Sequence, residues 1–436
     1  MRRLRLAALL IAALIAVPLL VRAAGEGSSV YKELSFFGDV FQLVQADYVD
    51  PVDTNKLVAA ALNGMLTSLD PHSGYLDPTS YSEMQVETKG EFGGLGMEVT
   101  MKDGLVQVVS PIDDTPASRA AMQAGDIIIA IDGSPVLGLS LSEAVEKLRG
   151  PKNSTVRLTI RRGATAPFEL TLTREVIKVH PAHWKLYGKI GYLRISIFSE
   201  LADSEVRQAL DKMRSQAHDK LQGLVLDLRD DPGGLLDQAI AVSGDFLDRG
   251  QIVSTRGRHP QDNQQYNSHG DDLISGVPIV VLINGGTASA SEIVAGALHD
   301  NHRAVLMGVR SFGKGTVQTI IPIPGHGAVR LTTARYYTPS GRSIQEVGIE
   351  PDVVVQVASA ESANELKPIR ERDLPRALKN PDAGSPDKTD KEASDAVARI
   401  PAAAHPPTAP ASDVQLDRAL DYLRGNVTGK TGTRAP

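Results

Sequence analysis

The sequence predicts a multidomain α/β protein, and three observations support this class. At 436 residues the chain is too long for one ordinary hydrophobic core, so two or three domains are expected. Between residues 176 and 358, short apolar runs alternate with helical patterns, which is typical of an α/β layer structure. Residues 91–175 instead show short strand patterns between glycine turns, and residues 25–90 show a helical pattern.

Composition and charge exclude several classes of function. The apolar content of 42% is typical of a soluble globular protein, and the net charge of -6 is mild. Nucleic-acid binding would require a clustered basic face, which nothing here indicates. The chain contains no cysteine, which excludes a thiol nucleophile, a lipoprotein anchor and a disulfide framework. Stability must therefore come from the burial of apolar side chains.

Residues 1–24 have the pattern of an export signal. Three arginines precede an apolar run over residues 6–21, and Ala23 and Ala24 offer a cleavage site. A membrane span needs about 20 apolar residues, so this run is on the short side. We expect a cleaved signal and an exported protein, whereas a retained signal would anchor the protein in the membrane.

Residues 25–90 predict helices that pack on another part of the protein. Apolar side chains recur at helical spacing from Leu34 to Val44, and a second helix is expected near Lys56 to Leu69. Residues 70–74, Asp-Pro-His-Ser-Gly, end this helix as a turn. Two helices make a poor core, so we expect them to brace a neighbouring domain or a dimer interface.

The C-terminal part predicts a linker and then a helix. Residues 359–412 are rich in Ala, Pro, Asp and Lys and poor in aromatic side chains, which predicts a disordered linker. Residues 413–436 begin with Val414, Leu416, Leu420 and Leu423 near helical spacing. We expect this short helix to pack on the body or on a partner chain.

The domain at residues 91–175 begins with the glycine-rich run Gly93-Gly94-Leu95-Gly96-Met97, which leads into a strand. A second strand lies between turns at residues 124–133, and a helix begins at Ser140 with a Ser140/Glu143 capping pair. This pattern resembles a PDZ domain, a β-barrel-like fold, over nearly its whole length.

The PDZ resemblance implies that an extended C-terminal peptide binds as an added strand at a sheet edge. The loop at Gly94, Leu95 and Gly96 would hold the terminal carboxylate with its backbone amides, and glycines let the backbone approach the anion closely. The alternative is a glycine-rich hairpin without a ligand.

Two predicted buried strands in residues 176–358 are followed by turns that contain candidate catalytic residues. The run Leu224–Leu228 is followed by Arg-Asp-Asp-Pro-Gly-Gly, and the run Val277–Ile283 is followed by a turn and a helix near Ser289. A serine at such a turn can act as a nucleophile, because the first helical amides and the helix dipole favour a nearby anion. The alternative is a capping box formed by Ser289 and Glu292.

Lys314 is a candidate base for Ser289. The sequence shows no Gly-x-Ser-x-Gly elbow around Ser289 and no recognisable order of Ser, His and Asp. A lysine can accept a proton if burial lowers its pKa, and the glycines on both sides of Lys314 let the backbone pass close to the site. The alternative is a solvated loop lysine.

Three runs together resemble a known family. They are Thr-Ala-Ser-Ala-Ser-Glu-Ile, Phe-Gly-Lys-Gly-Thr-Val-Gln and Asp-Leu-Arg followed by Pro-Gly-Gly. They are similar to the core of the carboxy-terminal processing (tail-specific) serine peptidases, and the resemblance covers about Ser29 to Val355. It implies a crotonase-like α/β core in which Ser289 is the nucleophile, Lys314 the general base and Gln318 the residue that orients the lysine.

The same resemblance implies an oxyanion hole. It would consist of the amide of Ala290 and the amide of either Gly233 or Gly234, a choice that the sequence leaves open. Many relatives have asparagine where Asp230 and Asp231 stand here, which changes the local charge but not the backbone geometry.

The implied activity is peptide hydrolysis through an acyl-enzyme, without a cofactor. The PDZ domain would recruit substrates by apolar C-terminal tails. The family setting implies the bacterial periplasm or extracytoplasmic face, and an adaptor protein or a homo-oligomer formed through the N- and C-terminal helices is compatible with it.

Two other functions are compatible with parts of the pattern. The strand, glycine turn and helix also resemble acyl-CoA enzymes of the crotonase type, and a PDZ scaffold on an inactive peptidase core is the non-enzymatic alternative. His299 and His302 flank Asp300 near a helix end, but no His-Glu-x-x-His pattern supports a metal site. Asp300 matches an acidic position near the active site of some relatives, which implies a supporting role.

Overall fold

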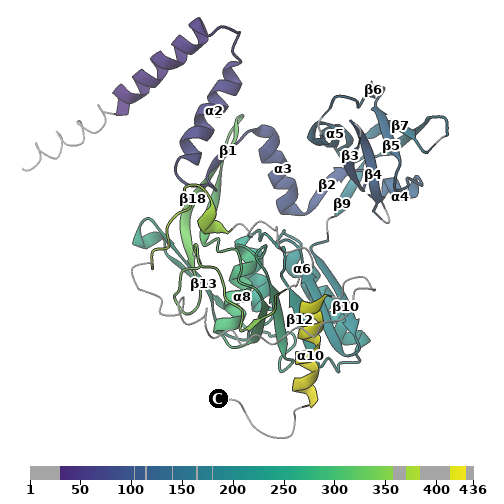
Figure 1. Ribbon diagram of the computed structural model, residues 1–436, viewed down its shortest axis with the longest axis vertical. Coiled ribbons are helices and arrows are strands. Elements are labelled where there is room, and N and C mark those ends of the chain that lie inside the picture. The colour runs from purple at the N-terminus through teal and green to yellow at the C-terminus, as the bar shows by residue number, and fades with distance from the viewer. Residues whose placement is uncertain are drawn as a thin grey trace, which may run out of the picture. The chain divides into compact units, whose positions relative to one another are not determined.

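The structure is a computed structural model, shown in Figure 1. It describes residues 30–102, 104–112, 115–139, 141–163, 165–178, 180–356, 370–382 and 413–428. The chain forms two compact units, Met1–Leu66 and Thr67–Pro436. The expected export signal lies outside the described residues.

Helices form the N-terminal region, as predicted. One helix covers residues 30–47, and α2 (Thr54–Thr67) and α3 (Pro78–Lys89) follow it. Most of the predicted apolar stripe on the first helix is exposed in the single chain, with Leu34 at 59% and Phe37 at 53%. No helix in the described ranges is both long and apolar enough to cross a bilayer.

Residues 91–178 form a separate β-rich domain. A two-stranded pair, β2 and β9, leads into and out of an antiparallel sheet with the strand order β3-β4-β5-β7-β8, and β6 pairs with β5. The elements are β2 (Glu91–Gly94), β3 (Met97–Lys102), β4 (Leu105–Pro111), α4 (Pro116–Arg119), β5 (Ile127–Ile131), β6 (Ser134–Pro135), α5 (Leu141–Leu148), β7 (Thr155–Arg161), β8 (Phe168–Thr173) and β9 (Glu175–Lys178). Its own apolar core includes Val106, Ile128 and Leu158, all fully buried.

A six-stranded sheet is the centre of the C-terminal domain. Its order is β10-β11-β12-β15-β16-β19, with β10 antiparallel and the other neighbours parallel. The strands are β10 (Ala182–Tyr187), β11 (Ile190–Ile195), β12 (Gly223–Asp227), β15 (Ile279–Ile283), β16 (Ala304–Gly308) and β19 (Val353–Val354). Every residue of β12 and β15 is buried, because these central strands are covered on both faces.

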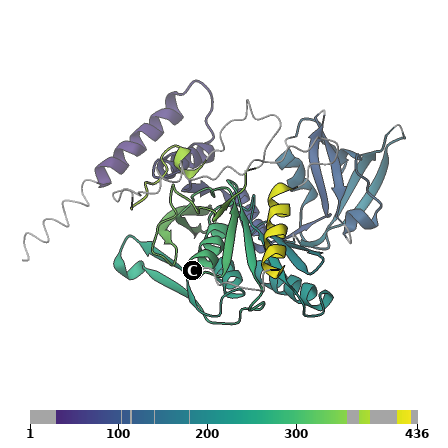
Figure 2. The same ribbon diagram turned by 60° about the horizontal axis from the view of Figure 1, so that its bottom comes forward.

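Helices cover both faces of this sheet. Side chains of α6 (Ala202–Gln216), α7 (Leu236–Gly244) and α8 (Ala290–Asp300) share one core with Leu224 and Leu226 of β12. The alternate side chain Val225 faces the opposite core, which holds Leu416, Leu420 and Leu423 of α10 (Val414–Thr428). Figures 1 and 2 show α10 along the sheet, so the expected C-terminal helix packs on the body.

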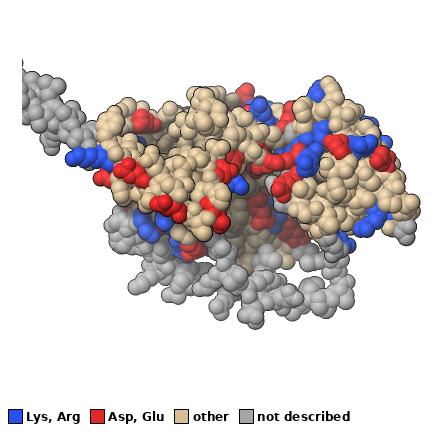
Figure 3. Space-filling view, turned by 90° about the horizontal axis from the view of Figure 1, so that it is seen from above, with Lys and Arg blue, Asp and Glu red and all other residues tan. Residues whose placement is uncertain are grey.

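A second, antiparallel sheet carries the strand that follows Lys314. Its order is β1-β18-β13-β14, and β17 pairs with β18. The strands are β1 (Gly74–Leu76), β13 (Gly250–Gly257), β14 (Gln264–Ser268), β17 (Thr316–Ile323) and β18 (Gly327–Tyr337). On the face seen in Figure 3, acidic and basic side chains lie among uncharged ones and form no continuous basic patch.

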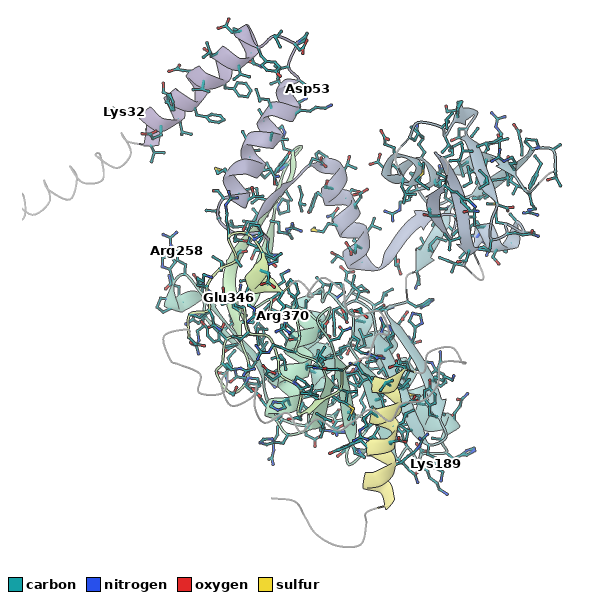
Figure 4. The ribbon with its side chains drawn as sticks, in the orientation of Figure 1. Lys32, Asp53, Lys189, Arg258, Glu346 and Arg370 are labelled. Atoms are coloured by element: carbon teal, nitrogen blue, oxygen red, sulfur yellow. The ribbon has the colours of Figure 1, made fainter. Side chains whose placement is uncertain are left out.

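The expected linker at residues 359–412 needs a correction. Within it, residues 370–382, here called the C-terminal strap, are packed on the core, and Glu371 in its short helix η2 (Glu371–Asp373) is fully buried. Figure 4 labels Arg370, where the strap begins, and Glu346, which accepts hydrogen bonds from Asn380 N–H (2.8 Å) and Lys379 Nζ (3.0 Å). Composition shows that the segment lacks a core of its own, but the strap binds through polar contacts to a core formed elsewhere. The rest of the expected linker lies outside the described residues.

Candidate active site

Ser289 occupies the turn between β15 and α8, as its N-cap residue. Its backbone has φ 57° and ψ -114°, and the residue is 6% exposed. A non-glycine residue in such a conformation costs about 1–3 kcal/mol, so its surroundings must hold it there. The side chain therefore sits on a strained, buried turn at the N-terminus of a helix, where the first-turn amides and the dipole favour an anion.

Gly233 lies directly against this turn. A Cβ built on Gly233 would be 2.9 Å from Ser289 Cβ and 2.8 Å from Ala290 N, which leaves no room for a side chain. The Gly233 N–H donates to Asp231 Oδ1 at 2.9 Å. The neighbouring glycine, Gly234, makes its close approach elsewhere, because a Cβ there would lie 2.3 Å from Phe198 O. The structure thus brings Gly233, Ser289 and Ala290 together.

Glu292 connects the serine turn with the lysine loop. Its Oε2 accepts from the amides of Ser289 and Lys314, each at 2.9 Å, and its Oε1 accepts from Ser311 Oγ (2.5 Å) and Gly313 N–H (2.8 Å). The residue is completely buried, and burial raises its pKa to about 7 while the four donors oppose this shift. Because one carboxylate oxygen binds both amides, the backbones of Ser289 and Lys314 meet at Glu292.

Lys314 has the electrostatic character that a base requires. Burial of the amine lowers its pKa, and the nearby charge of Arg330 lowers it further. Glu371, Glu292 and Asp70 oppose this shift by favouring the charged form. The net effect is a pKa below that of a solvated lysine, so the neutral amine forms more readily. A solvated loop lysine was the alternative that the sequence left open.

Gln318 follows Lys314 on β17 and belongs to a hydrogen-bond chain. Its amide nitrogen donates to Thr316 Oγ1 (3.0 Å) and to Thr332 Oγ1 (3.2 Å). The Thr332 hydroxyl in turn donates to Asp70 Oδ1 at 3.1 Å. Gln318 is therefore fixed by threonine hydroxyls, and its direct action on Lys314 stays a prediction.

Tyr336 is a site residue that the sequence patterns did not indicate. It lies on β18, is 5% exposed, and its N–H donates to Gly315 O at 2.9 Å. Burial raises the pKa of its phenol to about 12, and a hydrogen bond with the Ser289 side chain opposes this shift. No local pattern around Tyr336 indicates this contact, because Ser289 is distant in the sequence and Tyr336 is placed by the pairing of β18 with β13.

Comparison with known proteins identifies the family. A carboxy-terminal-processing protease of Bartonella bacilliformis is 49% identical over 403 residues, which cover 92% of this chain and 90% of that protein. The model of peptidase family S41 matches residues 189–355. The chain belongs to peptidase family S41. It is a serine-type peptidase of the carboxy-terminal-processing group, and the predicted enzyme class is confirmed.

Further comparisons cover the other parts of this S41 peptidase. A PDZ domain model matches residues 107–162, and a model of the activating protease CtpB N-terminal domain matches residues 19–80. The carboxy-terminal processing protease CtpA of Bacillus subtilis is 34% identical over 338 residues, 77% of this chain and 71% of that protein. The solved structure of a photosystem II D1 C-terminal processing protease is 31% identical over 73% of this chain and 92% of that chain, with a TM-score of 0.44. The predicted fold class, a helical N-terminal region with a PDZ domain and an α/β peptidase core, is confirmed.

The expected peptide loop of the PDZ domain precedes an edge strand. Gly96 has φ 73° and lies against Thr115, so a side chain at Gly96 would clash with Thr115 Cβ at 2.2 Å. Leu95 is buried in the domain core, and Gly94 ends β2. Strand β3, which begins at Met97, is at the edge of its sheet and pairs with β4.

Asp300 does not lie beside Ser289, which corrects the supporting role implied for it. The two residues stand at opposite ends of α8. Asp300 hydrogen-bonds with His299 Nδ1 at 2.9 Å, and Asp352 with His299 Nε2 at 3.2 Å. These two carboxylates raise the pKa of His299 to about 9. Within the described residues no group of three or more histidine and acidic side chains could hold a metal ion.

Proposed function

We propose that Ser289 and Lys314 form the catalytic dyad of an endopeptidase that acts through an acyl-enzyme. Neutral Lys314 takes the hydroxyl proton of Ser289 as Oγ attacks the scissile carbonyl, and it returns the proton to the leaving amine. Water then hydrolyses the ester with Lys314 again as the base. The observation that carries the proposal is the shared Glu292 Oε2, which accepts from the amides of both residues.

The oxyanion would be held by the Ala290 amide and by one amide of the Gly233-Gly234 turn. The contact of Gly233 with Ser289 and Ala290 supports a role for this turn. Since the Gly233 N–H donates to Asp231, it would have to leave this carboxylate in order to bind the oxyanion.

The test of the dyad uses purified Ser289→Ala and Lys314→Ala variants with an unstructured protein substrate. Both variants should remain folded and lose nearly all proteolysis, because removing either member of a catalytic unit abolishes most of the activity of the whole unit. Hydrolysis by folded Ser289→Ala at the wild-type rate would contradict the assignment. Failure of a fluorophosphonate to label Ser289 in the wild type would favour a PDZ scaffold on an inactive core.

The PDZ domain is proposed to bind the apolar C-terminal tails of substrates. Support comes from the edge strand β3, to which a peptide can add, directly after the loop of Gly94, Leu95 and Gly96. Titration with one peptide as the free acid and as the C-terminal amide tests this. A free carboxylate should be required, and equal affinities would contradict the proposal.

Export and self-association are proposed on separate grounds. The signal pattern of residues 1–24 supports export to the periplasm or another extracytoplasmic compartment, which fractionation and N-terminal sequencing of the mature protein would test. The exposed apolar side chains of helix 30–47 support a homo-oligomer. Replacement of Leu34 and Phe37 by aspartate should then yield a monomer in light scattering.

A further inference from the structure

A second buried carboxylate, Glu371, is attached to the loop of Lys314. It belongs to the C-terminal strap, and its N–H donates to Phe312 O at 3.2 Å. Its side chain is fully buried, and His72 Nε2 lies 2.9 and 2.8 Å from the two carboxylate oxygens. Glu292 and Glu371 therefore bind the same loop from two different parts of the chain.

Gln345 joins Glu371 to the other side of Lys314. Its Oε1 accepts from Gly315 N–H at 2.9 Å, and its Nε2 donates to Glu371 Oε1 at 3.0 Å and to Leu378 O at 2.9 Å. Gln345 is completely buried, so these hydrogen bonds are not exposed to competing water. Glu371 thus holds the loop directly at Phe312 and through one side chain at Gly315.

His72 comes from the turn at residues 70–74, where the sequence predicts the end of a helix. Asp70 Oδ1 accepts from the His72 N–H at 2.9 Å, and the His72 carbonyl accepts from Arg330 Nε at 2.8 Å. These contacts fix the turn, so His72 is a rigid partner for Glu371. Through Thr332 the same turn also reaches Gln318.

The charges around Lys314 give this arrangement a chemical consequence. Arg330 on β18 lowers the pKa of Lys314, whereas Glu371 of the strap, Glu292 of α8 and Asp70 of the turn raise it. Among these three carboxylates, Glu371 has the largest effect. A carboxylate here also stabilises the lysine cation that forms when the Ser289 proton is transferred.

We propose that Glu371, held by His72 and Gln345, is a positioning residue for Lys314: it fixes the loop on both sides of the base and supplies negative charge to the ammonium form. The proposal rests on the role of Lys314 as the general base. It makes the C-terminal strap a required part of the active site.

The test compares Glu371→Gln with Glu346→Gln in the full-length protein. Glu346 also holds the strap, through Lys379 and Asn380, but is not among the carboxylates with the largest effect on Lys314. The rate of Ser289 labelling by a fluorophosphonate is measured across pH for both variants and the wild type. Loss of the Glu371 charge should move the rising limb about one unit to lower pH, roughly tenfold in rate on that limb, and lower the plateau. Glu346→Gln should keep the wild-type limb.

An unchanged or alkaline-shifted limb in folded Glu371→Gln would overturn the proposal, whatever its plateau rate. Absence of Ser289 labelling in the wild type would instead contradict the proposed function. His72→Ala and His72→Gln provide a second measurement, because glutamine keeps a donor for Glu371 and alanine does not. The labelling rate of His72→Gln should exceed that of His72→Ala. Equal rates in the two folded variants would show that His72 does not hold Glu371.

Discussion

Replacement of Glu292 by glutamine should damage both the stability and the active site of the peptidase. The carboxylate accepts four hydrogen bonds in a completely buried position, two at each oxygen. Glutamine has one oxygen, so its NH2 group must face two donors. If the NH2 group takes the position of Oε2, the amides of Ser289 and Lys314 both lose their acceptor.

The cost can be worked out from these contacts. An unsatisfied buried donor costs about 1–3 kcal/mol, so two of them destabilise the fold by about 2–6 kcal/mol. A typical domain is stable by about 5–15 kcal/mol, which makes this a large fraction of the total. In addition, the strained backbone of Ser289 loses the acceptor that holds its N–H, so the labelling rate should fall even where the variant is folded.

Urea unfolding followed by circular dichroism, with Ser289 labelling in the absence of urea, measures both effects. Glu205→Gln is the matched control, because Glu205 pairs with the exposed His180. Its free energy of unfolding should change by less than about 1 kcal/mol. A loss below about 1 kcal/mol for Glu292→Gln, together with wild-type labelling, would refute the reasoning.

Three further predictions concern the oxyanion turn and the base. Burial raises the pKa of Asp231 to about 7, and its Oδ2 has no hydrogen-bond partner among the residues that the structure describes. The stability linked to this raised pKa is complete below the unfolded value near 3.8 and is lost as pH rises through about 7. The Asp231→Asn variant keeps an acceptor for Gly233 and does not ionise. Its free energy of unfolding in urea, relative to that of the wild type, should therefore increase between these two pH values. Gly233→Ala should abolish Ser289 labelling because its Cβ would clash with Ala288 O at 2.7 Å; normal labelling would contradict the tight packing. Gln318→Glu should move the rising limb of acylation to higher pH because an added anion favours charged Lys314, and an unchanged limb would show that Gln318 does not act on the lysine.

Local sequence patterns were sufficient to predict the strands and the helix next to the proposed catalytic residues. The largely apolar run of β12 and the fully apolar run of β15 predicted buried strands, and the start of α8 at Ala290 followed from the turn and serine before it. These features depend on residues adjacent in sequence, which a sequence pattern can report. The capping contact that was the alternative interpretation of this serine is also present, since the Glu292 carboxylate accepts from the Ser289 N–H.

Contacts between distant segments were not predictable in the same way. The three other partners of Glu292 lie in residues 311–314, and the hydrogen bond of Tyr336 with Ser289 depends on strand register. The strap was assigned to a linker because its composition cannot support a core, yet Glu371 is buried by side chains from other segments. Composition indicates whether a segment can form a hydrophobic core of its own. It does not indicate whether the segment can bind to the surface of a domain that is already folded.

In the proposed mechanism, the charge arrangement lets Lys314 take both protonation states that the reaction needs. Before attack the amine must be neutral, and burial together with Arg330 favours that form. Once the Ser289 proton has moved, the same nitrogen is a cation in a buried site, where an isolated charge would be costly. Glu371, Glu292 and Asp70 then stabilise it, and all three are fixed by hydrogen bonds that exist before the substrate arrives. Because these carboxylates need not move during the reaction, their stabilisation of the charged lysine costs no reorganisation at the moment of proton transfer.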